Sequence, residues 1–129
     1  MNFRIAFICF VFFATTSCVK SQTEGVILAD VATFEQKITT DGVQLVDVRT
    51  PEEFEEGHLP NAVNINIKDA DFQAKIGALD KTKPVLVYCK SGGRSGKACG
   101  IMKELGFTNI TDLDGGITNW VAEGKPIDN

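Results

Sequence analysis

The chain has 129 residues, 43% of them hydrophobic, and its 13 basic and 17 acidic side chains give a formal net charge of −4. This length suits one domain, and the acidic balance argues against general nucleic-acid binding. The four cysteines, at positions 9, 18, 89 and 99, are too few for a disulfide-dense scaffold and lack the paired spacing of zinc ligands.

The first 17 residues differ in composition from the rest. They hold five of the nine Phe residues, and Arg4 precedes a wholly apolar run at 5–14. This run is short for a membrane span and suits the apolar core of a signal peptide. The next four residues, TTSC (15–18), resemble the lipobox of bacterial lipoproteins, although Thr15 stands where an aliphatic residue is usual. The resemblance implies cleavage before Cys18 and lipid attachment to it.

We therefore predict a signal peptide at 1–17, a polar tether at 18–25 and one domain at 26–129. The alternatives are an ordinary cleaved signal peptide and an uncleaved anchor. All three place the domain outside the cytoplasm, and the lipid-anchored form lies on the periplasmic side of a bacterial membrane. Without the leader, 112 residues with 12 basic and 17 acidic side chains remain, still enough for one core.

Helix and strand patterns alternate along the domain. Hydrophobic spacing predicts helices at 30–39, between Thr50 and Gly57, and at 71–79, 95–105 and 117–123. It predicts strands at 44–48, 63–67, 85–88 and 109–113. This alternation predicts an α/β fold, a doubly wound parallel sheet flanked by helices. Working sites in such sheets lie at the carboxyl ends of strands, so we expect the chemistry just after Val48 or Tyr88.

Two of the predicted helices have recognisable first residues. Asp30 suits the N-cap of the first helix. Thr50 and Glu53 have the spacing of a capping box, with Pro51 at the first helical position.

The strongest candidate site is CKSGGRS (89–95), where a thiol follows a buried strand and precedes a tight loop and a helix. If the loop wraps around the sulfur, its backbone N–H groups form an anion-binding nest, and the helix adds its positive N-terminal end. Lys90 and Arg94 add full positive charge. All of these effects favour the thiolate, so Cys89 is a candidate nucleophile. The alternative is a buried structural cysteine before a glycine-rich turn.

Three stretches together resemble the single-domain rhodaneses, a family of sulfurtransferases. They are VDVRTPEEFEEGHLPNAVNI (46–65), VLVYCKSGGRS (85–95) and LDGGITNWVAEGKPI (113–127). The resemblance covers roughly 26–127. It implies a doubly wound α/β fold and a cysteine that cycles through a persulfide, and it implies neither a metal nor an organic cofactor.

Carried over by motif, Cys89 matches the sulfur-accepting cysteine, and Ser95 matches the residue that opens the next helix. The loop that holds the persulfide and the anionic donor matches Lys90, Ser91, Gly92, Gly93 and Arg94. The implied reaction has two displacements: the thiolate takes the outer sulfur of a donor such as thiosulfate, and a thiol or cyanide acceptor then removes it. Related phosphatases have five residues between Cys and Arg. The four residues here make a smaller cradle that suits sulfur.

Two other functions are compatible with the same residues. One is a non-catalytic domain that carries persulfide or binds a protein partner, and the other is a redox sensor that pairs Cys89 with Cys99. The expected partners are a small anionic sulfur donor and a thiol acceptor or protein, with no nucleic acid, and we expect a monomer.

Four further residues are interpreted as structural. Asp47 and Arg49 match a family pair and are expected to form an ion pair that anchors the loop after the strand. The resemblance implies that His58, the only histidine, is structural. Asn61 replaces a usual Gly, and Asn tolerates the left-handed backbone that the turn needs. Packing is the preferred interpretation of Cys99.

Overall fold

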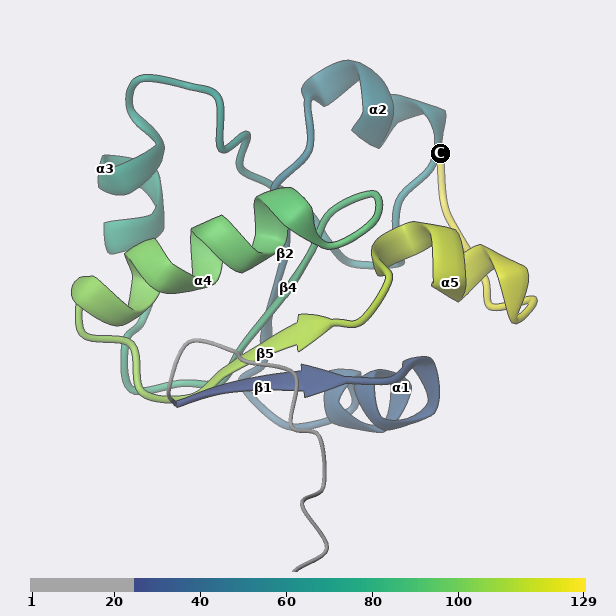
Figure 1. The fold of residues 1–129 in the computed structure, drawn as a ribbon, viewed down its shortest axis with the longest axis horizontal. Helices are drawn as coiled ribbons and strands as arrows, with labels where there is room; N and C mark the ends of the chain where they lie inside the picture. Colours follow the sequence, from purple (N-terminus) through teal and green to yellow (C-terminus); the bar gives the residue numbers. More distant parts are fainter. Residues whose placement is uncertain (1–24) are drawn as a thin grey trace, which may run out of the picture.

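The short apolar runs of the sequence form a five-stranded sheet in the computed structural model, which describes residues 25–129 (Figure 1). The strands are β1 (Val26–Ala29), β2 (Gln44–Asp47), β3 (Val63–Asn64), β4 (Val85–Tyr88) and β5 (Ile110–Leu113). All of them pair in parallel, in the order β1-β5-β4-β2-β3. Every residue of the central strand β4 is buried.

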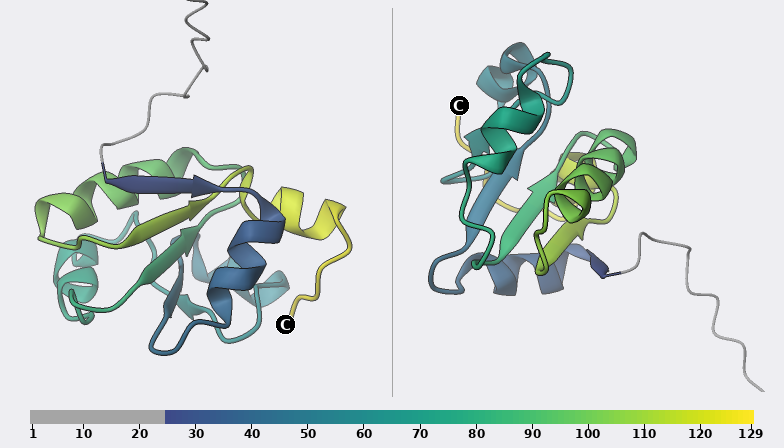
Figure 2. Two further views of the ribbon diagram at one scale, coloured as in Figure 1. Left: turned by 90° about the horizontal axis from the view of Figure 1, so that it is seen from below. Right: turned by 90° about the vertical axis from the view of Figure 1, so that its left-hand side faces the viewer.

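Five helices cover both faces of the sheet, so the predicted doubly wound α/β fold is confirmed (Figure 2). They are α1 (Val31–Ile38), α2 (Pro51–Glu56), α3 (Phe72–Gly77), α4 (Gly93–Glu104) and α5 (Gly116–Ala122). One core cluster joins α3 and α4 to the sheet through Val85 and Val87, and a second joins α1 and α5 through Leu86 and Tyr88. The alternating side chains of β4 thus serve both layers.

The capping signals in the sequence are confirmed. The Asp30 side chain accepts a hydrogen bond of 2.8 Å from the Thr33 N–H and caps α1. The capping box between Thr50 and Glu53 is present at the start of α2, and Gly57 ends that helix.

The structure differs from the sequence-based elements at three places. β1 was not predicted; its run VILA directly joins the predicted tether to the first helix. β3 is shorter than predicted, since the Asn66 side chain accepts from the Lys68 N–H and turns the chain, although Ile65 and Ile67 still donate to β2 and to Val48 beyond it. α4 begins at Gly93 instead of Ser95. The first helical turn therefore forms part of the loop that the sequence singled out.

The predicted signal peptide, Cys18 and nearly all of the predicted tether lie outside the described residues. Within residues 25–129, no helix has the length and apolar character needed to cross a membrane.

The last residues of the chain, 123–129, run from the end of α5 to the end of α2 and form the C-terminal strap. Trp120 Nε1 donates to the Pro126 carbonyl at 2.8 Å, and Lys125 pairs with Glu35 of α1 at 3.1 Å. The backbones of His58 and Asp128 then exchange two hydrogen bonds of 2.8 Å. This C-terminal strap carries Ile127 to the carboxyl ends of the strands.

Candidate active site

Cys89 directly follows the central strand and is 1% exposed. Its Sγ accepts a hydrogen bond of 3.0 Å from the Gly92 N–H and lies 3.4 Å from the Ser95 Oγ. Gly92 has φ +116°, a conformation that side chains disfavour, so glycine is required for the turn that aims its N–H at the sulfur. The sulfur therefore lies inside a tight loop at the N-terminus of α4.

The first turn of α5 donates hydrogen bonds to the backbone carbonyls of this loop. The Ile117 N–H donates to the Cys89 carbonyl at 2.9 Å, and Thr118 donates to the Lys90 carbonyl through its N–H at 3.1 Å and its hydroxyl at 2.9 Å. In a planar trans peptide the N–H points opposite to the C=O. The N–H groups that follow these two carbonyls, those of Lys90 and Ser91, therefore face away from α5.

The other predicted loop residues take different positions. Lys90, Ser91 and Gly93 are exposed, whereas Ser95 is fully buried. Arg94 turns to α2, where its Nη1 and Nη2 donate to the Glu53 carboxylate at 2.8 and 3.2 Å. These hydrogen bonds hold the pKa of Glu53 below its usual value. The charge of Arg94 is thus paired, and of the two loop cations only Lys90 is left without an ion pair.

The predicted ion pair of Asp47 and Arg49 is confirmed and buried, with Arg49 Nη2 2.7 Å from Asp47 Oδ2. The same nitrogen donates to the Gly57 carbonyl at 2.7 Å, and the guanidinium lies 5.7 Å from the ring centre of Tyr88. The Tyr88 hydroxyl accepts from the Leu59 N–H at 3.0 Å, and burial raises the pKa of this phenol well above its usual value. These contacts tie β2 and β4 to the end of α2.

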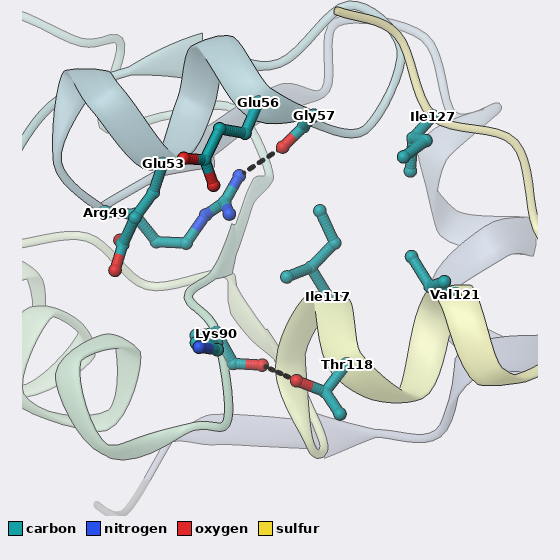
Figure 3. A pocket seen from close by; sticks show the side chains of 9 residues that line it. All are labelled: Arg49, Glu53, Glu56, Gly57, Lys90, Ile117, Thr118, Val121 and Ile127. Atoms are coloured by element: carbon teal, nitrogen blue, oxygen red, sulfur yellow. Dashed lines mark hydrogen bonds between the residues drawn. The ribbon is translucent and has the colours of Figure 1, made fainter.

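A pocket of about 330 Å³ opens beside the loop (Figure 3). One side is apolar and comes from α5 and the C-terminal strap, namely Ile117, Val121 and Ile127. The other side is mostly charged, namely Arg49, Glu53, Glu56 and Lys90, and Gly57 and Thr118 complete the lining. Both Val121 and Ile127 are about half-exposed, so the apolar side is open to a ligand.

Comparison with known families agrees with this geometry. The model of the Rhodanese-like domain matches residues 30–123, which is most of the chain. The protein belongs to the rhodanese-like family.

Relatives of this rhodanese-like domain are named for sulfur transfer. A sulfurtransferase of Allochromatium vinosum is 35% identical over 88 residues, which cover 68% of this chain and 80% of the relative. The thiosulfate sulfurtransferase PspE of Escherichia coli is 36% identical over 70 residues, which cover 54% of this chain and 67% of the relative.

Solved structures agree as well. The crystal structure of a rhodanese-related protein from Thermoplasma volcanium superposes with a TM-score of 0.70 at 31% identity. The match covers 79% of this chain and 97% of that one.

His58 and Asn61 lie between α2 and β3. The His58 Nδ1 lies 2.9 Å from the Phe54 carbonyl, and its ring stacks on Phe54 with centroids 3.8 Å apart. Asn61 has φ +66°, which confirms that the turn keeps its left-handed residue although Asn replaces the usual Gly.

Cys99 lies on the buried face of α4 and, like Cys89, is a free thiol. Burial, with the nearby charges of Asp112 and Cys89, raises the pKa of the Cys99 thiol well above its usual value. A thiol that stays protonated is a poor redox partner, so these facts favour packing over the sensor.

Two residues at the site were missed by sequence reasoning as partners of the loop. Glu53 was recognised only as part of the capping box, yet it also binds Arg94. Asp112 was taken as one residue of a strand, and the largely polar run TNITDLD (108–114) gives no signal of its burial.

Proposed function

We propose that the protein is a sulfurtransferase that moves the outer sulfur of an anionic donor such as thiosulfate to a thiol or cyanide, with Cys89 as nucleophile. The observation that carries the proposal is the Cys89 sulfur, held by the Gly92 N–H at 3.0 Å at the carboxyl end of the central strand. The names of the relatives support the same chemistry.

The reaction divides into two displacements at one sulfur. The Cys89 thiolate attacks the outer sulfur of thiosulfate, a new S–S bond forms, and sulfite leaves with the electron pair of the broken S–S bond. The acceptor then attacks the outer sulfur and releases the Cys89 thiolate. Lys90, Ser91, Gly92, Gly93, Arg94 and Ser95 form the loop that would surround the donor. Their N–H groups and the positive end of α4 favour an anion.

The pocket beside Lys90 supports a route for the acceptor. Its volume of about 330 Å³ lies in the range of small-ligand sites, and its apolar side suits the carbon skeleton of a thiol.

The test is thiocyanate formation by the purified domain, residues 26–129, from thiosulfate and cyanide. We expect Cys89→Ala to abolish it, because the nucleophile is gone, and Cys99→Ala to keep it, because that thiol only packs. Mass spectrometry after thiosulfate should show one added sulfur on the tryptic peptide that contains Cys89. Activity that survives Cys89→Ala would overturn the proposal, and stable loading without turnover would instead make the protein a persulfide carrier.

We also propose that the domain is exported and anchored on the periplasmic side of a bacterial membrane by lipid on Cys18. The apolar run at 5–14 and the lipobox-like TTSC support this. The full-length chain should fractionate with membranes and the Cys18→Ala variant should not. A variant that stays with the membranes contradicts lipid attachment at Cys18.

A further inference from the structure

The Cys89 loop has less positive charge to offer than its two cations suggest. Arg94 lies in the first turn of α4, two residues after the Gly92 N–H that donates to the Cys89 sulfur. Its guanidinium binds the Glu53 carboxylate of α2 through two nitrogens, with nitrogen–oxygen distances of 2.8 and 3.2 Å. Bidentate pairs between arginine and a carboxylate are strong, so a carboxylate of the protein already occupies the Arg94 side chain.

Glu53 is itself fixed in place. Its Oε2 accepts from the Thr50 N–H at 3.3 Å, and its own N–H donates to the Thr50 hydroxyl at the same distance. The hydrogen bonds from Arg94 hold the pKa of Glu53 below its usual value, so the carboxylate is ionised at neutral pH. The side chains of Arg94 and Glu53 are only 26% and 32% exposed, so water and salt screen this pair less than a fully exposed one.

Lys90 differs from Arg94 in having no such partner. It directly follows Cys89, its side chain is exposed, and no carboxylate among residues 25–129 lies within ion-pair distance of it. Figure 3 shows Lys90 on the charged side of the pocket, as is Glu53. The other cation of this side, Arg49, is bound by a buried aspartate at 2.7 Å. Lys90 is therefore the cation whose charge is available to an incoming anion.

We propose that Glu53 determines the charge selectivity of the site: it neutralises Arg94, so that Lys90 attracts the anionic donor to Cys89. The inference rests on the proposed function and deepens it, because the motif alone assigns this attraction to Arg94 as well. A site with one available positive charge binds a dianion such as thiosulfate less tightly than a site with two. It also releases the sulfite product more readily.

The test measures the charge around Cys89 with two alkylating reagents of similar size. Iodoacetate is an anion and iodoacetamide is neutral, and both react with the thiolate with loss of iodide. The quotient of their rates therefore cancels differences in thiolate population and in access, and it retains the effect of charge. Alkylation is followed by mass spectrometry at physiological ionic strength. Tryptic cleavage after Lys97 separates the Cys89 peptide from the Cys99 peptide in every variant.

Glu53→Gln is the central variant, because glutamine can keep the capping box with Thr50 while the charge is removed. The quotient of the iodoacetate rate to the iodoacetamide rate should rise on the order of fivefold, since Arg94 then adds its charge to that of Lys90. It should return to the wild-type value when Arg94→Gln is combined with Glu53→Gln. Lys90→Gln alone should lower the quotient below the wild-type value.

Glu52→Gln is the matched control. It removes the same charge from the same first turn of α2, but Glu52 makes no ion pair within residues 25–129. Its quotient should equal that of the wild type. An unchanged quotient in Glu53→Gln, or an equal rise in Glu52→Gln, would overturn the proposal, and so would an unchanged quotient in Lys90→Gln.

Turnover of the donor gives a second readout. In thiocyanate formation, Glu53→Gln should lower the KM for thiosulfate, because the freed Arg94 strengthens binding of the anion. A lower kcat at unchanged KM would contradict the proposal, since it indicates a structural role only. If the wild type forms no thiocyanate, the proposed function fails. The alkylation quotients then still decide whether Glu53 controls the charge at Cys89.

Discussion

Gly116 lets the backbone of α5 approach the Cys89 loop. Its φ is +60°, and a Cβ there would overlap the carbonyl oxygens of Cys89 and Lys90, which are backbone atoms that cannot rotate away. We expect Gly116→Ala to lower the free energy of unfolding by on the order of 3 kcal/mol. It should also lower sulfur loading of Cys89, because the hydrogen bonds that α5 donates to the loop would be displaced.

Gly124 supplies the matched control for Gly116. It has φ +73° with open space around its Cβ position, so Gly124→Ala adds the conformational strain without the overlap. That variant should lose about 1–2 kcal/mol and keep its sulfur loading. Urea unfolding and mass spectrometry after thiosulfate measure the two quantities. Equal losses for both variants would show that the close approach of α5 does not shape the loop.

At the scale of elements, local signals in the sequence were sufficient wherever a helix or strand is specified by its own residues. The capping box at Thr50 and the apolar run of β4 are such cases. β1 was missed although its four residues are as apolar as those of β4, and its role as an edge strand is seen only in its pairing with β5. Strand pairing between distant segments leaves no period in the sequence.

The same distinction applies to the candidate site. Cys89 and its glycine-rich loop are contiguous, so the motif alone identified them. Arg94 pairs with Glu53, which lies 41 positions away in the sequence. The positive charge that the motif assigned to the loop is therefore paired with a carboxylate of α2. The place of Asp112 beside Val87 likewise depends on the register of β4 and β5. Only the folded chain brings these partners together.

At the scale of the whole molecule, the site exists because parallel strands end at one edge. Asp47 ends β2 and Cys89 follows β4 at this edge. The pocket beside them has α2 on one side and α5 with the C-terminal strap on the other. A loop fixed on several sides keeps its N–H groups aimed before any ligand arrives. Such preorganisation is what stabilises developing charge without further rearrangement.

The buried carboxyl of Asp112 should lower the stability of the whole fold. The pKa of Asp112 is raised from 3.8 to about 6 in the folded chain. At pH 3 and below it is mostly protonated in both states and costs almost nothing. As the pH rises toward 6 the unfolded chain ionises first, so folding loses about 3 kcal/mol, and the loss persists above pH 6.

Asp112→Asn cannot ionise and should escape this loss. Its free energy of unfolding, relative to wild type, should therefore rise by about 3 kcal/mol between pH 3 and pH 7, whatever the difference between the two proteins at pH 3. Asp114→Asn, which removes an exposed carboxyl two residues further along the chain, is the control. Urea unfolding at several pH values gives both slopes. A flat difference for Asp112→Asn would mean that the buried carboxyl ionises as easily in the folded chain as in the unfolded one.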